Sequence, residues 1–86
     1  MNETPLQYSM LIEWSIEDQA YLVTLPEWAE RVIMPVTHGN TYSEAVEQGQ
    51  EVLKLLVESA IQDGESLPSP KWYPGLFHSV PLRPYN

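Results

Sequence analysis

Residues 41–64, TYSEAVEQGQEVLKLLVESAIQDG, decide which fold the rest of the chain can adopt. The stretch opens with a capping signal, because the Thr41 hydroxyl can accept a hydrogen bond from the Glu44 amide while the Glu44 carboxylate reaches back to the amide of Thr41. It closes with Gly64, a residue that tolerates the left-handed conformation at which many helices end. These signals predict one long helix over residues 41–63.

Apolar and small side chains recur along this stretch at three- and four-residue spacing. They are Ala45, Val46, Gly49, Val52, Leu53, Leu56, Val57, Ala60 and Ile61. One face of the predicted helix must therefore lie on another layer of the protein. Gly49 costs about 1 kcal/mol relative to alanine in the middle of a helix, and its presence predicts that a strand approaches the helix closely there.

Two segments before the helix have the pattern of strands. Residues 8–14 alternate, with Tyr8 and Trp14 on the same apolar face, so we expect Trp14 to pack in the core or on the sheet. Residues 20–25 are rich in β-branched and aromatic side chains, and the polar connection between the two segments predicts an antiparallel hairpin. Residues 31–36 are a third candidate, which their proline confines to an edge or to a strand end.

These elements predict an α+β domain with a three- or four-stranded, mostly antiparallel sheet and one long helix packed on it. Residues 1–70 form this domain, and residues 71–86 form a proline- and aromatic-rich tail. Exposure of so much aromatic surface is unfavourable, so we expect the tail to be an oligomer contact; the alternative is that it folds back on its own sheet. The contact residues are Trp72, Tyr73, Phe77 and Tyr85.

Composition excludes several kinds of function. Four basic and twelve acidic side chains give a net charge of -8, which repels nucleic acid and anionic membrane surfaces. The acidity fits a basic protein partner, and it equally fits a need for solubility alone. The absence of cysteine removes disulfides, thiolate nucleophiles and cysteine-ligated zinc. No leader-like or membrane-spanning segment is evident, so we expect a cytoplasmic protein.

Catalytic and metal-binding patterns are not recognisable. Glu13 lies within a predicted strand, Glu17 and Asp18 lie in the hairpin connection, and the acidic residues of the helix fit its cap and its solvated face. His38 and His78 have no accompanying residues that would make a triad or a zinc site. We therefore predict a protein that is not an enzyme and has no metal or cofactor.

Four motifs in succession resemble the HicB-type antitoxin family of bacteria. They are the opening strand at 8–12, the second strand at 20–26 with its final proline, the helix entry HGNTYSEA at 38–45, and the LPSP segment at 67–70. The resemblance implies a partial ribonuclease-H-like fold. The loop EWAER at 27–31 departs from the usual sequence of the family, and the DNA-binding module that many members carry is not found after the LPSP segment.

The resemblance also implies a function, in which the protein sequesters a small basic mRNA-cleaving toxin of the HicA type by protein–protein contact. We assign partner binding to Trp28, Glu27, Glu30 and His38. Trp28 is either an exposed contact or a buried side chain, and His38 is either a partner contact or a surface or hinge residue. One alternative is an orphan homo-oligomeric relative with a different partner or ligand and no toxin. Another is a degenerate metal-dependent nuclease.

Overall fold

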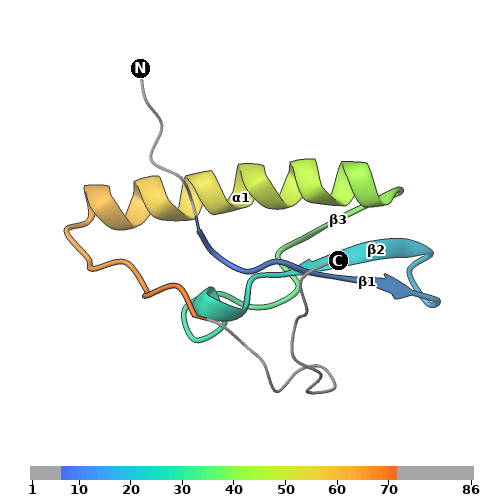
Figure 1. The fold of residues 1–86 in the computed structure, drawn as a ribbon, viewed down its shortest axis with the longest axis horizontal. Helices are drawn as coiled ribbons and strands as arrows, with labels where there is room; N and C mark the ends of the chain where they lie inside the picture. The colour runs from blue at the N-terminus through green and yellow to red at the C-terminus, as the bar shows by residue number, and fades with distance from the viewer. Residues whose placement is uncertain (1–6, 72–86) are drawn as a thin grey trace, which may run out of the picture.

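The computed structural model describes residues 7–71, and Figure 1 shows a small sheet with one long helix along one side of it. The elements are β1 (Leu11–Ser15), β2 (Ala20–Thr24), the 3-10 helix η1 (Pro26–Trp28), β3 (Thr37–Gly39) and α1 (Tyr42–Gln62). The sheet is antiparallel with the strand order β1-β2-β3. The predicted α+β class, with a three-stranded antiparallel sheet and a single long helix packed on it, is confirmed.

The predicted hairpin is present, and its register runs from Ser15 opposite Ala20 to Leu11 opposite Thr24. The connection closes with Gln19 at a φ of 53°, a left-handed conformation that turns the chain back into β2. β1 begins three residues later than residue 8, the start that the sequence predicted. The preceding residues instead bond to η1 and to the segment that follows α1.

The prediction of a third strand at residues 31–36 is wrong, because β3 follows that segment. The carbonyl of Trp28 accepts hydrogen bonds from the amides of Arg31 and Val32, at 3.0 Å each, and so bends the chain back on itself. The peptide bond before Pro35 is cis, and Pro35 has no amide hydrogen for a ladder. Because of the bend at Trp28 and the missing amide hydrogen of Pro35, pairing with β2 begins at Thr37.

The N-terminus of α1 follows the predicted capping pattern with one difference. The Thr41 hydroxyl accepts a hydrogen bond from the Glu44 amide at 3.0 Å, as expected. The Glu44 carboxylate accepts from the amide of Asn40 instead of that of Thr41, one residue earlier than predicted. The Thr41 hydroxyl therefore satisfies an amide of the first helical turn, and Glu44 bonds the amide of the residue before the cap.

The C-terminus of α1 is a Schellman motif. Gly64 has a φ of 73°, and its amide donates to the carbonyl of Ile61 at 3.1 Å. The next amide, that of Glu65, donates to the carbonyl of Ala60 at 2.9 Å. Gly64 therefore ends the helix in the left-handed conformation that the sequence predicted.

The core lies between the sheet and the inner face of α1. Its buried residues are Val23, Leu25, Trp28, Ala45, Leu53 and Ala60. A Cβ atom on Gly49 would lie 2.8 Å from the Met10 sulfur and 3.1 Å from the Val23 Cγ1 atom, which confirms the predicted close approach of helix and sheet. Gly39, at the end of β3, lies against backbone, because a Cβ atom there would contact the amide nitrogen of Ala45 and lie 2.8 Å from its Cα atom.

Candidate functional site

The carboxylate of Glu27 is the centre of a polar network that joins both ends of the described chain. Only 9% of Glu27 is exposed. Its oxygens accept hydrogen bonds from the Ser9 amide at 3.0 Å, the Ser9 hydroxyl at 3.1 Å and the Lys71 amide at 3.0 Å. Ser9 precedes β1, Glu27 lies in η1 and Lys71 follows α1, so one side chain connects three segments that are distant in sequence.

Two opposing effects set the pKa of Glu27. Burial is the largest single effect and raises the pKa, because it removes water from around the charged form. The hydrogen bonds from the amides of Lys71, Ser9 and Glu27 itself, and from the Ser9 hydroxyl, together outweigh burial and hold the pKa of Glu27 below its ordinary value. Glu27 is therefore ionised in the folded protein at neutral pH, and its charge is shared among amide donors.

Trp28 is part of the core, with 2% of its surface exposed. The Tyr8 ring meets it edge-on with 5.6 Å between the ring centroids, and the Arg31 guanidinium carbon lies 5.4 Å from the centre of its ring. The alternative in which Trp28 is exposed is wrong, because η1 turns its side chain inward towards Leu25 and the rest of the core cluster. Among residues 7–71, no acceptor bonds to the buried Trp28 Nε1.

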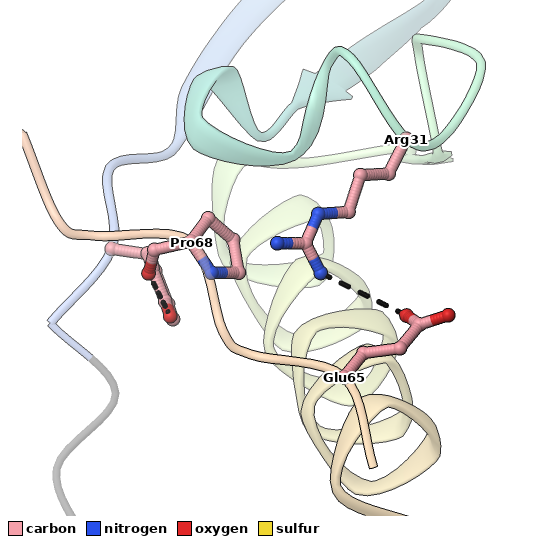
Figure 2. A network of polar contacts seen from close by, with 4 residues as sticks. Arg31, Glu65 and Pro68 are labelled. Atoms are coloured by element: carbon pink, nitrogen blue, oxygen red, sulfur yellow. Dashed lines mark hydrogen bonds and ion pairs between the residues drawn. The ribbon is translucent and has the colours of Figure 1, made fainter. Parts of the chain in front are cut away.

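The segment after α1 returns past the N-terminal segment. The Tyr8 hydroxyl donates to the carbonyl of Pro68 at 2.6 Å. Figure 2 shows Pro68 close to the ion pair between Arg31 and Glu65, whose nearest atoms are 3.9 Å apart. The Arg31 side chain is 36% exposed and that of Glu65 is 61% exposed, so solvent screens this pair and it contributes little to stability. The Tyr8 and Glu27 hydrogen bonds are the main polar contacts of the LPSP segment and its following lysine.

The structure separates the four residues to which we assigned partner binding. Glu27, Trp28 and Glu30 lie together in η1 and the turn after it, whereas His38 lies in β3 opposite Leu22. Glu27 and Trp28 are buried, so Glu30 and His38 are the two that present exposed side chains. The role of all four residues in partner binding stays a prediction.

The predicted oligomer-contact residues lie outside the described part of the chain. They are Trp72, Tyr73, Phe77 and Tyr85. The expected contact between tail and partner subunit, and its alternative, stay predictions.

Sequence analysis did not identify an aromatic row that crosses one end of the sheet. The rings of Trp14 and Tyr21 meet edge-on with centroids 4.9 Å apart, and the Tyr21 and Tyr42 centroids are 4.3 Å apart. Trp14 packs on the sheet as expected but is 47% exposed, and Tyr42 is 62% exposed. The signal was available, because counting outward from the hairpin connection places Trp14 opposite Tyr21.

The surface of residues 7–71 is strongly acidic. Exposed carboxylates occur on β1, in the hairpin connection, after η1, along α1 and beyond its end. They are Glu13, Glu17, Asp18, Glu30, Glu47, Glu51, Glu58, Asp63 and Glu65. The exposed basic residues of the same region are Arg31, Lys54 and Lys71. Most of the acidic side chains therefore face solvent without a basic neighbour nearby in the sequence.

Two further findings concern residues 7–71. No three His, Asp or Glu side chains in this part of the chain come close enough together to hold a metal ion. None of its helices combines the length and the apolar character needed to cross a lipid bilayer.

Comparison of the chain with models of protein families, with curated proteins and with solved structures found no match.

Proposed function

We propose that the chain is a HicB-like, antitoxin-related binding protein of the bacterial cytoplasm that sequesters a small basic mRNA-cleaving toxin by protein–protein contact. The observation that carries the proposal is the surface charge. Nine exposed carboxylates outnumber three exposed basic side chains over residues 7–71. Such an imbalance attracts a basic protein and accelerates its association. The choice of toxin among basic partners, and the partial ribonuclease-H-like fold, rest on the four motifs that resemble the antitoxin family.

The fold supports a binding role in a second way. The buried Glu27 network holds the N-terminal segment, η1 and the segment after α1 together, so the surface around them is held in one arrangement before any partner binds. A pre-organised surface loses little conformational entropy on association. Glu30 and His38 are the exposed residues that we propose contact the toxin.

Co-expression tests the proposal directly. A reading frame for a small basic protein next to the gene of this chain would be expressed alone and together with the full chain. We expect growth arrest from the small protein alone, recovery when the full chain is present, and a complex that co-elutes in size-exclusion chromatography. Absence of such a reading frame, or arrest that the chain does not relieve, would contradict an antitoxin function.

The alternative is an orphan homo-oligomeric relative whose partner or ligand is not a toxin. Its support is the small size of the two-layer fold, since α1 covers one side of the sheet and small one-helix domains commonly gain a further layer from a second copy. Light scattering on the full chain measures the assembly state. A stable oligomer, together with no neighbouring toxin gene, would favour this alternative.

A further inference from the structure

β1 is an edge strand of the sheet formed by the described residues, and the direction of its backbone groups follows from the hydrogen bonds of β2. The carbonyl of Val23 accepts a hydrogen bond from the amide of Val36 at 2.9 Å, so the backbone of Val23 points towards β3. Backbone groups alternate in direction along a strand, so the backbone of Leu22 points towards β1, where its partner is Glu13.

The same alternation continues along β1. Glu13 points towards β2, so its neighbours Ile12 and Trp14 direct their N–H and C=O groups away from the sheet. The hairpin agrees with this assignment, because the carbonyl of Ser15 points inward and accepts from the Gln19 amide at 2.8 Å. β1 therefore presents a donor and an acceptor at each of two positions along the sheet edge.

Side chains of two kinds flank this edge. Val23 packs under α1, and Trp14 of β1 lies on this same face of the sheet. Glu13 lies on the opposite face. Trp14 is 47% exposed because α1 lies over β2 and β3 and covers little of β1. Exposed Glu17 and Asp18 follow directly after β1 in the hairpin connection. One side of the edge is therefore aromatic, and the other side and the hairpin end are acidic.

We propose that the β1 edge binds an extended basic segment of a protein partner, which adds a fourth strand to the sheet. The proposal rests on the proposed function in one respect, since it takes the partner to be the small basic protein. The added strand exchanges backbone hydrogen bonds with Ile12 and Trp14. Its alternate side chains are basic where they face Glu13 and apolar where they face Trp14, because directly opposite residues share a face of the sheet.

Charge favours this occupant over a second copy of the chain. Each copy carries a net charge of -8 and brings the same three carboxylates to its β1 edge. A two-fold axis at Glu13 would place two Glu13 side chains directly opposite each other, an unfavourable arrangement of like charges. A basic strand meets the same carboxylates with attraction, which salt weakens.

The first test uses a synthetic probe, an acetylated and amidated peptide in which lysine and valine alternate. We would titrate it into the full chain and follow amide chemical shifts and hydrogen exchange by NMR. In the free chain we expect fast exchange at the amides of Ile12 and Trp14, and the peptide should slow it. The amide of Glu13 should change little, because it already bonds to β2. The same peptide with methylated valine amides should bind at least about tenfold more weakly, since it cannot complete the strand.

Three outcomes would overturn the proposal. Shifts confined to α1, or equal binding of the methylated peptide, would mean that the carboxylates attract the probe without strand addition. Slow exchange at Ile12 and Trp14 in the free, dilute chain would mean that another part of this chain already covers the edge. Slow exchange that appears only as protein concentration rises would assign the edge to a second copy.

Variants of the full chain provide the matched comparison. Trp14→Pro removes the outward amide without touching the β1–β2 ladder, and Trp14→Val removes the ring but keeps the amide. We expect Trp14→Pro to bind the peptide at least about tenfold more weakly than Trp14→Val does. Glu13→Lys should weaken binding, whereas Glu58→Lys, on the outward face of α1, makes the same charge change and should have a much smaller effect.

The same variants separate this proposal from the proposed function. If the neighbouring basic protein binds the chain but Trp14→Pro and Glu13→Lys leave its affinity unchanged, the proposed function stands and the β1 edge is not its site. If the peptide binds at the edge but the basic protein does not bind, the edge site stands and the toxin assignment is wrong. Circular dichroism of each variant establishes that it is folded, and Glu13→Lys gives the test if Trp14→Pro does not fold.

Discussion

Replacement of Glu27 by glutamine isolates the contribution of the buried carboxylate, because the two side chains have nearly the same shape. Three donors from other residues point at Glu27, and they belong to the Ser9 amide, the Ser9 hydroxyl and the Lys71 amide. A glutamine offers one acceptor oxygen and one NH₂ donor in their place. With the NH₂ group at the Oε2 position, the Lys71 amide loses its acceptor. With the NH₂ group at the Oε1 position, the Ser9 amide faces that group and keeps only its longer contact, 3.3 Å, to the other oxygen.

The size of the effect follows from this count. A hydrogen bond to a charged group contributes about 1.5–3 kcal/mol, and a buried donor left without an acceptor costs about 1–3 kcal/mol. Removal of the negative charge also eliminates the unfavourable burial of the ionised group, which offsets part of the loss. We therefore expect Glu27→Gln to lower the free energy of unfolding by about 2–3 kcal/mol, a large share of the stability of a small domain.

Urea unfolding of the full chain, followed by far-ultraviolet circular dichroism, measures this change. Glu30→Gln is the matched control, because it makes the same chemical change on an exposed side chain three residues away. The control should shift the free energy of unfolding by no more than about 0.5 kcal/mol. Equal midpoints and slopes for Glu27→Gln and the wild type at neutral pH would refute the structural role of the carboxylate.

Acid provides an independent check on the same residue. The folded-state pKa of Glu27 lies below its ordinary value, so its charged form is stabilised by folding. This contribution is complete above the unfolded-state pKa of about 4.3 and is lost as the pH falls through the lower folded-state pKa. The stability difference between wild type and Glu27→Gln should therefore shrink in acid. A difference that stays constant from neutral pH into acid would contradict the direction of the pKa shift.

Three further predictions concern the helix entrance and catalysis. Thr41→Ala should lower the free energy of unfolding by about 1 kcal/mol, the usual loss for a capping hydroxyl, and an unchanged denaturant midpoint would contradict the cap. Gly39→Ala should cost about 1–3 kcal/mol or more by overpacking against the backbone of Ala45; thermal unfolding measures the loss, and a melting temperature equal to that of the wild type would contradict the close approach. The purified chain should not cleave RNA or an RNA–DNA hybrid in magnesium or manganese; cleavage that Glu13→Gln or Asp18→Asn abolishes would overturn the non-catalytic assignment.

The helix was predictable because its signals are local. The Thr41 hydroxyl lies three residues from the amide that it caps, and Gly64 ends the helix through a backbone conformation that needs no distant contact. The apolar stripe of α1 then requires a second layer, whatever that layer is. The hairpin was predictable for the same reason, since a short polar connection between two alternating segments brings neighbours in sequence together.

The third strand was not predictable, because its position depends on contacts across the chain. Residues 31–36 have strand-forming side chains, yet the Trp28 carbonyl accepts from the amides of Arg31 and Val32 and bends the start of the segment into a turn. The rest of the segment is placed by contacts with residues around β2, since the Met34 sulfur accepts from the Leu25 amide and the Val36 amide donates to the Val23 carbonyl. β3 then pairs where Gly39 can approach the helix backbone, a requirement set by α1. Strand propensity evaluates each segment separately and favoured residues 31–36. Tertiary packing instead placed the third strand at Thr37–Gly39.

By itself the sequence determined the class of fold, its long capped helix, its hairpin and its acidic character. These properties depend on local hydrogen bonds, on side-chain periodicity and on a count of charges. Only the tertiary structure decided that Trp28 is buried, that Glu27 connects Ser9 to Lys71, and that β1 is left at an edge with Trp14 half exposed. Each of these depends on which distant segments lie side by side, and that arrangement forms only when the whole chain packs.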